Sequence, residues 1–244
     1  MRSLRLALVL LCAAVASAFV LAPSSAFAQP VNCCLLPENG GGTADLPPNC
    51  PIGYNGLGVI DQGFPAGSSL LVVARLHSFT GVVAAPGGLL SGETQQWQGT
   101  LDLTLTGTGI FSSYARFLQL PVIGETHSAP RVPFAAVQSF NTLLFTMQGQ
   151  LLGDVDFDLF RVTAGNGFGM PSPGQTTLTT SSGAWLVDSY LDITYRVDLI
   201  GRSPGTFGGY SGSSTNVLEH FSMCHEEATP TTRSTWGAMK VRYR

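Results

Sequence analysis

Three aspartates alternate with other residues near the middle of the chain, at positions Asp154, Asp156 and Asp158. On a β-strand this alternation places the three carboxylates on one face, about 7 Å from one to the next. Carboxylate oxygens suit Ca²⁺, but a calcium loop also needs a glycine-bearing turn and a distal acid, whereas Leu159 and Phe160 continue the strand pattern. We therefore interpret the three aspartates as a solvated strand face and expect no metal there.

A second group of chemically capable side chains lies near the C-terminal end, where histidines and acids gather around one cysteine. The group comprises Glu219, His220, His225, Glu226 and Glu227. Imidazole beside carboxylate suits metal binding or general acid-base catalysis. Because these residues flank a cysteine next to an expected linker, we interpret them as exposed polar residues beside a disulfide.

The sequence patterns of common enzyme classes are missing from this chain. His77 and His127 have no recognisable partner spacing, and the stretch 208–212 lacks the Gly-x-Ser-x-Gly spacing of a nucleophile elbow. No zinc-ligand pattern or phosphate-binding glycine loop can be assembled, so we predict no cofactor and favour a protein that is not an enzyme. One enzyme class stays open, a secreted hydrolase whose two carboxylates meet only in the folded chain. The acids considered for such a pair are Asp102, Asp154, Asp156, Asp158, Asp188, Asp192 and Asp198.

The first 28 residues have the composition of a secretory signal peptide. Arg2 and Arg5 precede an apolar run at 6–21, and a small-x-small pattern ends at Ala28. The run is shorter than the 18 to 20 residues that typically span a bilayer. We predict cleavage after Ala28, no membrane span in the mature chain, and a secreted, periplasmic or cell-envelope location.

Four cysteines remain once this leader is removed, and an even number in an oxidising compartment predicts two disulfides. The candidates are Cys33, Cys34, Cys50 and Cys224. A bond between the neighbours Cys33 and Cys34 would close a strained ring, so we expect each of them to bond a different partner, Cys50 or Cys224. The alternative, a zinc site that includes His225, matches no known ligand spacing.

Aromatic side chains could instead bind a ligand by stacking. Trp97 and Tyr190 are the candidate ligand platform, and Phe111 with Tyr114 are further candidates. The alternative for each of these residues is packing in the core.

The strongest strand signal lies at 187–199, where apolar and polar residues alternate. Such alternation predicts a strand with one face on a core and one in water. Alternation at 101–106 predicts another half-buried strand, and 143–151 with 155–159 predict a hairpin. The residues of 187–199 expected to face the core are Val187, Leu191, Ile193, Tyr195, Val197 and Leu199.

These strands, separated by glycine and proline turns, favour an all-β protein, an antiparallel sandwich or barrel. We expect an antiparallel β-sandwich at 69–227. The preceding residues 29–68 are dense in proline, glycine and asparagine and predict an irregular segment held by disulfides. Residues 228–244 predict a linker and a short C-terminal tail.

Four stretches of the chain resemble segments of uncharacterised secreted bacterial proteins. They are 125–133 (Glu-Thr-His-Ser-Ala-Pro-Arg-Val-Pro), 136–140 (Ala-Val-Gln-Ser-Phe), 171–179 (Pro-Ser-Pro-Gly-Gln-Thr-Thr-Leu-Thr) and 187–198 (Val-Asp-Ser-Tyr-Leu-Asp-Ile-Thr-Tyr-Arg-Val-Asp). The resemblance implies an exported bacterial module with no known activity, and it carries over no catalytic residue.

The low content of charged residues limits which class of partner the protein can bind. Charged residues make up only 11% of the chain, and its 12 lysines and arginines form no basic run in the body. Nucleic acid is therefore excluded as a partner, because phosphate binding needs clustered positive charge. We expect an exported structural or binding module that contacts a glycan or an envelope protein. The alternatives are a carbohydrate-binding module and the hydrolase with paired carboxylates.

Overall fold

A computed structural model describes residues 34–223, which form ten strands and two 3-10 helices. Every strand pairing is antiparallel, which confirms the predicted all-β antiparallel class. The elements are β1 (Cys34–Pro37), β2 (Tyr54–Ile60), β3 (Leu70–Gly87), β4 (Gly92–Gly107), η1 (Gly109–Phe111), β5 (Ala115–Ser128), β6 (Val137–Leu152), β7 (Phe157–Ala164), η2 (Asn166–Phe168), β8 (Pro173–Ser181), β9 (Ala184–Gly201) and β10 (Ser211–Met223).

Several predicted features fall outside this part of the chain. The signal peptide at 1–28, the residues Cys33 and Cys224, and the tail at 228–244 lie outside the described residues. Within 34–223, no helix has the length and apolar character needed to cross a membrane.

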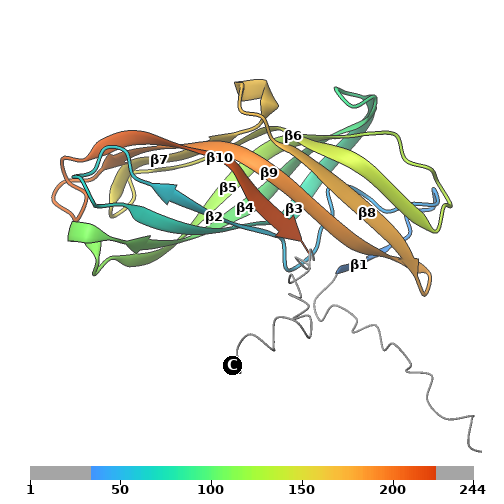
Figure 1. Ribbon diagram of the computed structural model, residues 1–244, viewed down its shortest axis with the longest axis horizontal. Coiled ribbons are helices and arrows are strands. Elements are labelled where there is room, and N and C mark those ends of the chain that lie inside the picture. Colours follow the sequence, from blue (N-terminus) through green and yellow to red (C-terminus); the bar gives the residue numbers. More distant parts are fainter. Residues whose placement is uncertain (1–33, 224–244) are drawn as a thin grey trace, which may run out of the picture. The chain divides into compact units, whose positions relative to one another are not determined.

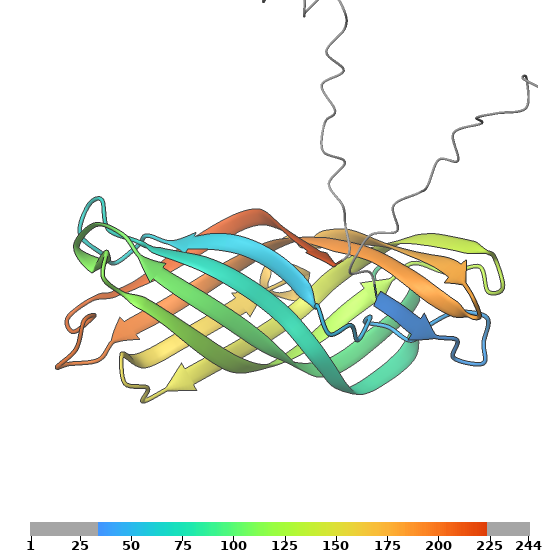
Figure 2. The same ribbon diagram turned by 90° about the horizontal axis from the view of Figure 1, so that it is seen from below.

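The strands form one sheet that closes on itself. Its order runs β9-β10-β2-β3-β4-β5-β6-β7, and β7 pairs again with β9. Figures 1 and 2 show the result as two layers of strands that face each other. The two layers expected of a sandwich are present, and both belong to one continuous sheet.

Strands β7 and β8 together act as one interrupted strand. Both lie between β6 and β9 and run antiparallel to each of them, with β7 at one end and β8 at the other. Between the two halves, residues 165–170 leave the sheet and carry η2, whereas the carbonyls of Pro171 and Ser172 accept hydrogen bonds from β9 and β6. This excursion is a structural interruption that does not open the sheet, because β8 continues the pairing where β7 stops.

Strand β9 packs as its alternation predicted. Its six expected core residues are all buried, which confirms the assignment of that face. The opposite face is partly covered as well, since Asp198 is buried beneath Arg161 and Ser213, both of which donate hydrogen bonds to it. The predicted hairpin is also present as β6 and β7, although β7 begins only at Phe157.

Side chains fill the space inside the closed sheet. At one end Phe157 stacks on Phe207 with ring centroids 5.2 Å apart, and at the other end Phe79 meets Trp97 edge-to-face at 5.0 Å. Two hollows within this core measure about 20 Å³ each. That is close to the space one water molecule needs. These two hollows are therefore too small for a ligand larger than water.

The predicted irregular segment 29–68 contains two strands, β1 and β2. The sequence does not reveal β2 because its inward positions Gly56 and Gly58 have no apolar side chain. A Cβ atom at Gly56 would lie 2.6 Å from the ring of Phe221, and one at Gly58 would meet the hydroxyl of Tyr195. The two glycines therefore leave room for rings from β10 and β9.

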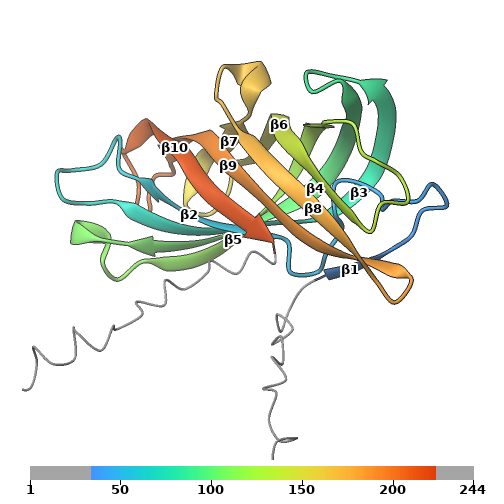
Figure 3. The same cartoon turned by 45° about the vertical axis from the view of Figure 1, so that its right-hand side comes forward.

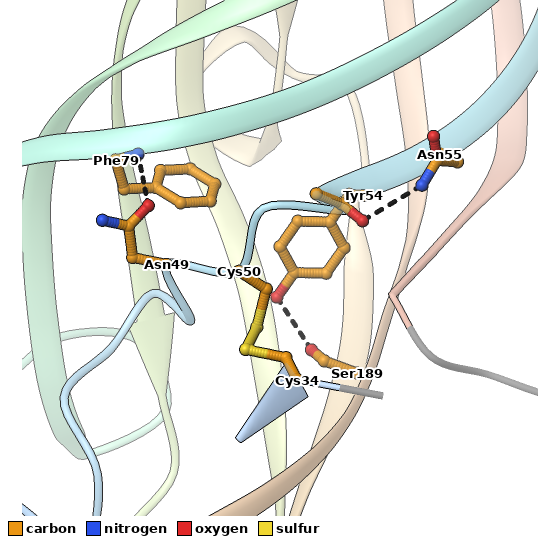
Figure 4. Close-up of a disulfide and its surroundings, with 8 residues drawn as sticks. Cys34, Asn49, Cys50, Tyr54, Asn55, Phe79 and Ser189 are labelled. Atoms are coloured by element: carbon orange, nitrogen blue, oxygen red, sulfur yellow. Dashed lines mark hydrogen bonds between the residues drawn. A yellow bond between two sulfur atoms is a disulfide. The ribbon is translucent and has the colours of Figure 1, made fainter. Parts of the chain in front are cut away.

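A disulfide joins Cys34 at the start of β1 to Cys50 in the loop before β2. Figure 4 shows this bridge beside Tyr54, whose hydroxyl lies 2.8 Å from the Oγ of Ser189. The same loop is held to β3 by a hydrogen bond from the Phe79 amide to the Asn49 side chain. This bridge is one of the pairings that the sequence allowed, and it attaches the N-terminal segment to the sheet.

The ends of β1 and β10 meet on one edge of β9. Cys34 lies opposite Val187, and Met223 lies opposite Ser189, two residues further along the same strand. Two residues of a strand span about 7 Å. The remaining predicted bridge, Cys33 to Cys224, would join the residues next to these two ends, and it stays a prediction.

The buried face of β9 gives a stability test. Ile193 is 1% exposed and lines a core hollow, so Ile193→Asp should lower the free energy of unfolding by several kcal/mol, because a lone charge would be buried. Ile200 on the same strand is 45% exposed, and Ile200→Asp is the matched control, expected to cost far less. Urea unfolding measures both, and equal effects would contradict the face assignment.

Peptide mapping of the non-reduced mature protein should return two cross-linked pairs, Cys34 with Cys50 and Cys33 with Cys224. A Cys50→Ser variant should lose about 3 kcal/mol of stability, because the bridge spans a sequence separation of 16 residues. Under reducing conditions parent and variant should unfold alike. Recovery of Cys33 and Cys224 as free thiols would refute the second pairing.

Candidate functional site

The outer face of β4, β5 and β6 carries a groove formed by two adjoining hollows of about 420 and 630 Å³. Both hollows share three floor residues, so they are continuous. The walls come from β3 and from the excursion between β7 and β8, and Figure 3 shows that excursion and the far end of the β3–β4 hairpin projecting from the same side of the sheet. The floor side chains are Gln96, Gln98, Ile123, Gln148 and Gln150, and the wall residues are Ser78, Thr80, Val83 and Phe168.

Strand register explains why the floor is rich in glutamine amides. Gln98 on β4 lies opposite Ile123 on β5, which lies opposite Gln148 on β6. Gln96 extends the row of amides on β4, and Gln150 extends it on β6. The floor therefore combines uncharged groups that both donate and accept hydrogen bonds with one apolar side chain between them.

Trp97 lies beneath this floor. The sequence suggested an exposed platform, but Trp97 is only 3% exposed and packs against Phe79, so that interpretation is wrong for this residue. Its ring occupies the space over Gly124, where a Cβ atom would lie 2.4 Å from the indole. The cross-strand partner of Trp97 must therefore be glycine, a constraint visible only once the β4–β5 register is known.

The second platform residue, Tyr190, lies away from the groove on β9. Its ring packs against His220 of β10 at a centroid distance of 5.2 Å. Of the two further aromatic candidates, Phe111 is buried in the core and Tyr114 donates a hydrogen bond to Asp156. The structure thus does not bring Trp97 and Tyr190 together on one face.

One charged residue borders the groove among the described residues that line it, namely Glu125. Its carboxylate accepts a hydrogen bond from the Gln96 amide at 3.2 Å and lies 2.7 Å from Nε2 of His127. The Leu89 amide donates to Nδ1 of His127, so that nitrogen accepts and Nε2 carries the proton that binds Glu125. Glu125 is therefore held in place by a buried histidine, which in turn stacks on Phe145.

A second histidine-acid pair lies at the edge of the groove, and sequence spacing did not reveal it. Nε2 of His77 lies 2.9 Å from the carboxylate of Asp102, and its Nδ1 lies 2.7 Å from Oγ of Ser78. Burial raises the pKa of Asp102, but hydrogen bonds from Arg75, Gln119 and His77 outweigh burial and hold that pKa below its ordinary value. Asp102 is therefore ionised at neutral pH and can only accept hydrogen bonds.

The row of aspartates is not a solvated strand face. Asp154 and Asp156 lie in the turn before β7, where Arg116 of β5 donates to both carboxylates at 2.5 Å. The hydrogen bond from Arg116 lowers the pKa of Asp154 further than burial raises it. Only Asp158 is exposed, and it lies 3.8 Å from the guanidinium of Arg202. The turn interrupts the alternation that the sequence suggested.

Two other candidate acids also contact nitrogen-bearing side chains. Asp198 pairs with Arg161, and Asp192 lies 2.7 Å from Nδ1 of His220. Of the C-terminal histidine-acid cluster, residues 225–227 lie outside the described residues. Within 34–223, no three histidine, cysteine or acidic side chains are grouped so that they could hold a metal ion. Asp154 and Asp156 thus share one arginine, Arg116, whereas Asp198 is bound by Arg161.

Comparisons of the chain with protein-family models, with curated proteins and with solved structures give no match. The described part of the chain is a closed antiparallel sheet with a filled interior and a polar groove on its outer face. Among the described residues that line this groove, Glu125 carries the one charge.

The Arg116 contact predicts acid sensitivity. A carboxyl whose pKa is lowered on folding contributes stability above its unfolded pKa of about 3.9, and this contribution is lost as the pH falls through the folded pKa. The unfolding free energy should therefore fall below about pH 5, and Asp154→Asn should flatten that dependence. Asp158→Asn is the exposed control and should leave the slope unchanged. Equal slopes for parent and Asp154→Asn would contradict the interpretation.

Proposed function

We propose that this protein is an exported binding module whose groove takes an uncharged carbohydrate. The observation that carries the proposal is the floor of four glutamine amides around Ile123, with Phe168 as an aromatic wall. A sugar presents hydroxyl groups, each of which donates and accepts, and amides match them in both roles. The carbohydrate-binding alternative is therefore preferred over a purely structural role.

The apolar part of the groove supports the same ligand class. Phe168 is 45% exposed, and Ile123 is an exposed apolar side chain on the floor. Sugar rings have an apolar face of C–H groups as well as polar edges, so an aromatic wall beside amides fits both parts of the ring. The glutamine amides together with Phe168 and Ile123 therefore support carbohydrate binding. The predicted platform of Trp97 and Tyr190 does not support it, because Trp97 is buried.

The charge of the residues that line the groove argues against ligands that carry phosphate. No lysine or arginine is among the described residues that line the groove, and Glu125 contributes a negative charge at its border. Phosphate-bearing ligands, nucleic acids included, would meet no cation there. A neutral glycan needs no cation and is not repelled by the carboxylate of Glu125.

Export is the second part of the proposal. The leader-like residues 1–28 and the resemblance to secreted bacterial proteins support a bacterial protein outside the inner membrane. The Cys34–Cys50 bridge is of the kind that persists in oxidising compartments. A secreted, periplasmic or envelope-associated protein is consistent with all three features.

A glycan array followed by calorimetry with the mature protein tests the groove. We expect a neutral oligosaccharide to bind, and Phe168→Ala to weaken its affinity about tenfold, which equals about 1.4 kcal/mol. Phe117→Ala is the matched control, because Phe117 is 56% exposed on β5 outside the groove. Unchanged affinity in Phe168→Ala, or no neutral glycan among the bound ligands, would refute the proposal.

A further inference from the structure

Three side chains at the edge of the groove are connected in the order needed to activate a serine. Oγ of Ser78 lies 2.7 Å from Nδ1 of His77, and Nε2 of the same ring lies 2.9 Å from the carboxylate of Asp102. Both distances lie within normal hydrogen-bond range. Ser78 is exposed and lines the larger hollow of the groove, whereas Asp102 is buried.

Hydrogen-bond roles fix where the protons lie. Asp102 also accepts hydrogen bonds from Arg75 and from Gln119, the latter at 3.0 Å, so its carboxylate is fully engaged as an acceptor. The proton between Asp102 and His77 must then sit on Nε2 of the imidazole. In the neutral ring, Nδ1 is left with its lone pair and accepts the hydroxyl proton of Ser78.

We infer that Ser78 is the nucleophile of an ester-hydrolysing site, with His77 as its general base and Asp102 as a positioning residue. The logic is that of the serine hydrolases, although the two ring nitrogens exchange places relative to the serine proteases. The site goes beyond carbohydrate binding. We expect the ester to be an O-acyl group on a sugar, and this choice of substrate rests on the proposed function.

The reaction is complete with water as the second substrate. Oγ of Ser78 bonds to the ester carbonyl carbon while its proton moves to Nδ1 of His77, and the alcohol then leaves with that proton as its bond to carbon breaks. Water attacks the acyl-serine and gives a proton to Nδ1, and Oγ recovers the proton when the acid is released. The sum is ester plus water to acid plus alcohol.

The surroundings of Ser78 support a reactive position. The residue has a φ of 55°, a left-handed conformation that is uncommon outside glycine and clusters at functional sites. It lies where the β3–β4 pairing shifts register between His77 and Thr80. Gln98 and Gln150 line the same hollow, and their amides are donors of the type that can stabilise an oxyanion.

Two assays on the purified mature protein test the site. One is hydrolysis of p-nitrophenyl acetate, and the other is labelling by a fluorophosphonate, in which the serine oxygen bonds to phosphorus and fluoride leaves. We expect hydrolysis above the buffer rate and a label located at Ser78 by mass spectrometry. Ser78→Gly and His77→Gln should each lower the rate about 100-fold or more.

Controls separate chemistry from folding. Glycine tolerates a positive φ, so Ser78→Gly should have a melting temperature no lower than that of the parent. His220→Gln alters another histidine-aspartate pair, outside the groove, and should leave the rate unchanged. A parental rate in Ser78→Gly, or the absence of any label at Ser78, would overturn the inference.

The outcome is independent of glycan binding, because neither small probe needs a sugar. Hydrolysis that depends on Ser78 in a protein that binds no glycan would overturn the proposed function and support the esterase site. Glycan binding without hydrolysis that depends on Ser78 would support the proposed function and overturn the esterase site.

Discussion

The pairing of β9 along both of its edges is the constraint on which the rest of the structure depends. β10 and β1 share one edge, and β7 and β8 share the other. An open sheet would leave unpaired backbone groups on its outer strands. Where β2 meets β10 there is one backbone pair, and the side chain of Asn216 bonds the amide and carbonyl of Val59 instead. Closure brings the two layers face to face around one core. Side chains fill that core, and the groove lies on the outer face.

Local departures from regular strand geometry create the site on that outer face. The β3–β4 ladder shifts register twice, between His77 and Thr80 and between Thr80 and Val83. Bulges of this kind bend a strand and redirect its side chains. Here they place β3 as a wall of the groove and hold Ser78 in its left-handed conformation beside His77. The regular ladders supply the floor, and the irregular segments supply the walls.

Sequence patterns predicted the parts of this fold that depend on local alternation. β9 was recognisable because nearly all of its inward residues are apolar and lie at every second position. In β6 a register shift opposite Glu125 and Thr126 breaks the alternation, so Leu144 and Met147 both face the core. β2 was not recognisable, because the core there is filled by rings from other strands above Gly56 and Gly58. The candidate site was also missed, since the contact between His77 and Asp102 joins two strands whose register is unknown beforehand. The burial of Trp97 depends on register in the same way.

The segment 165–172, which contains the excursion, has a consequence for engineering the groove. It lies between the two halves of one interrupted strand and supplies Phe168 to the groove. Its last two residues, Pro171 and Ser172, accept hydrogen bonds from the amides of Thr194 and Leu144 and so belong to the pairing of the sheet. Replacements at Phe168 and its exposed neighbours can reshape the groove while the backbone pairing of the sheet is retained. A combinatorial library confined to these exposed positions would sample new specificities on an unchanged scaffold.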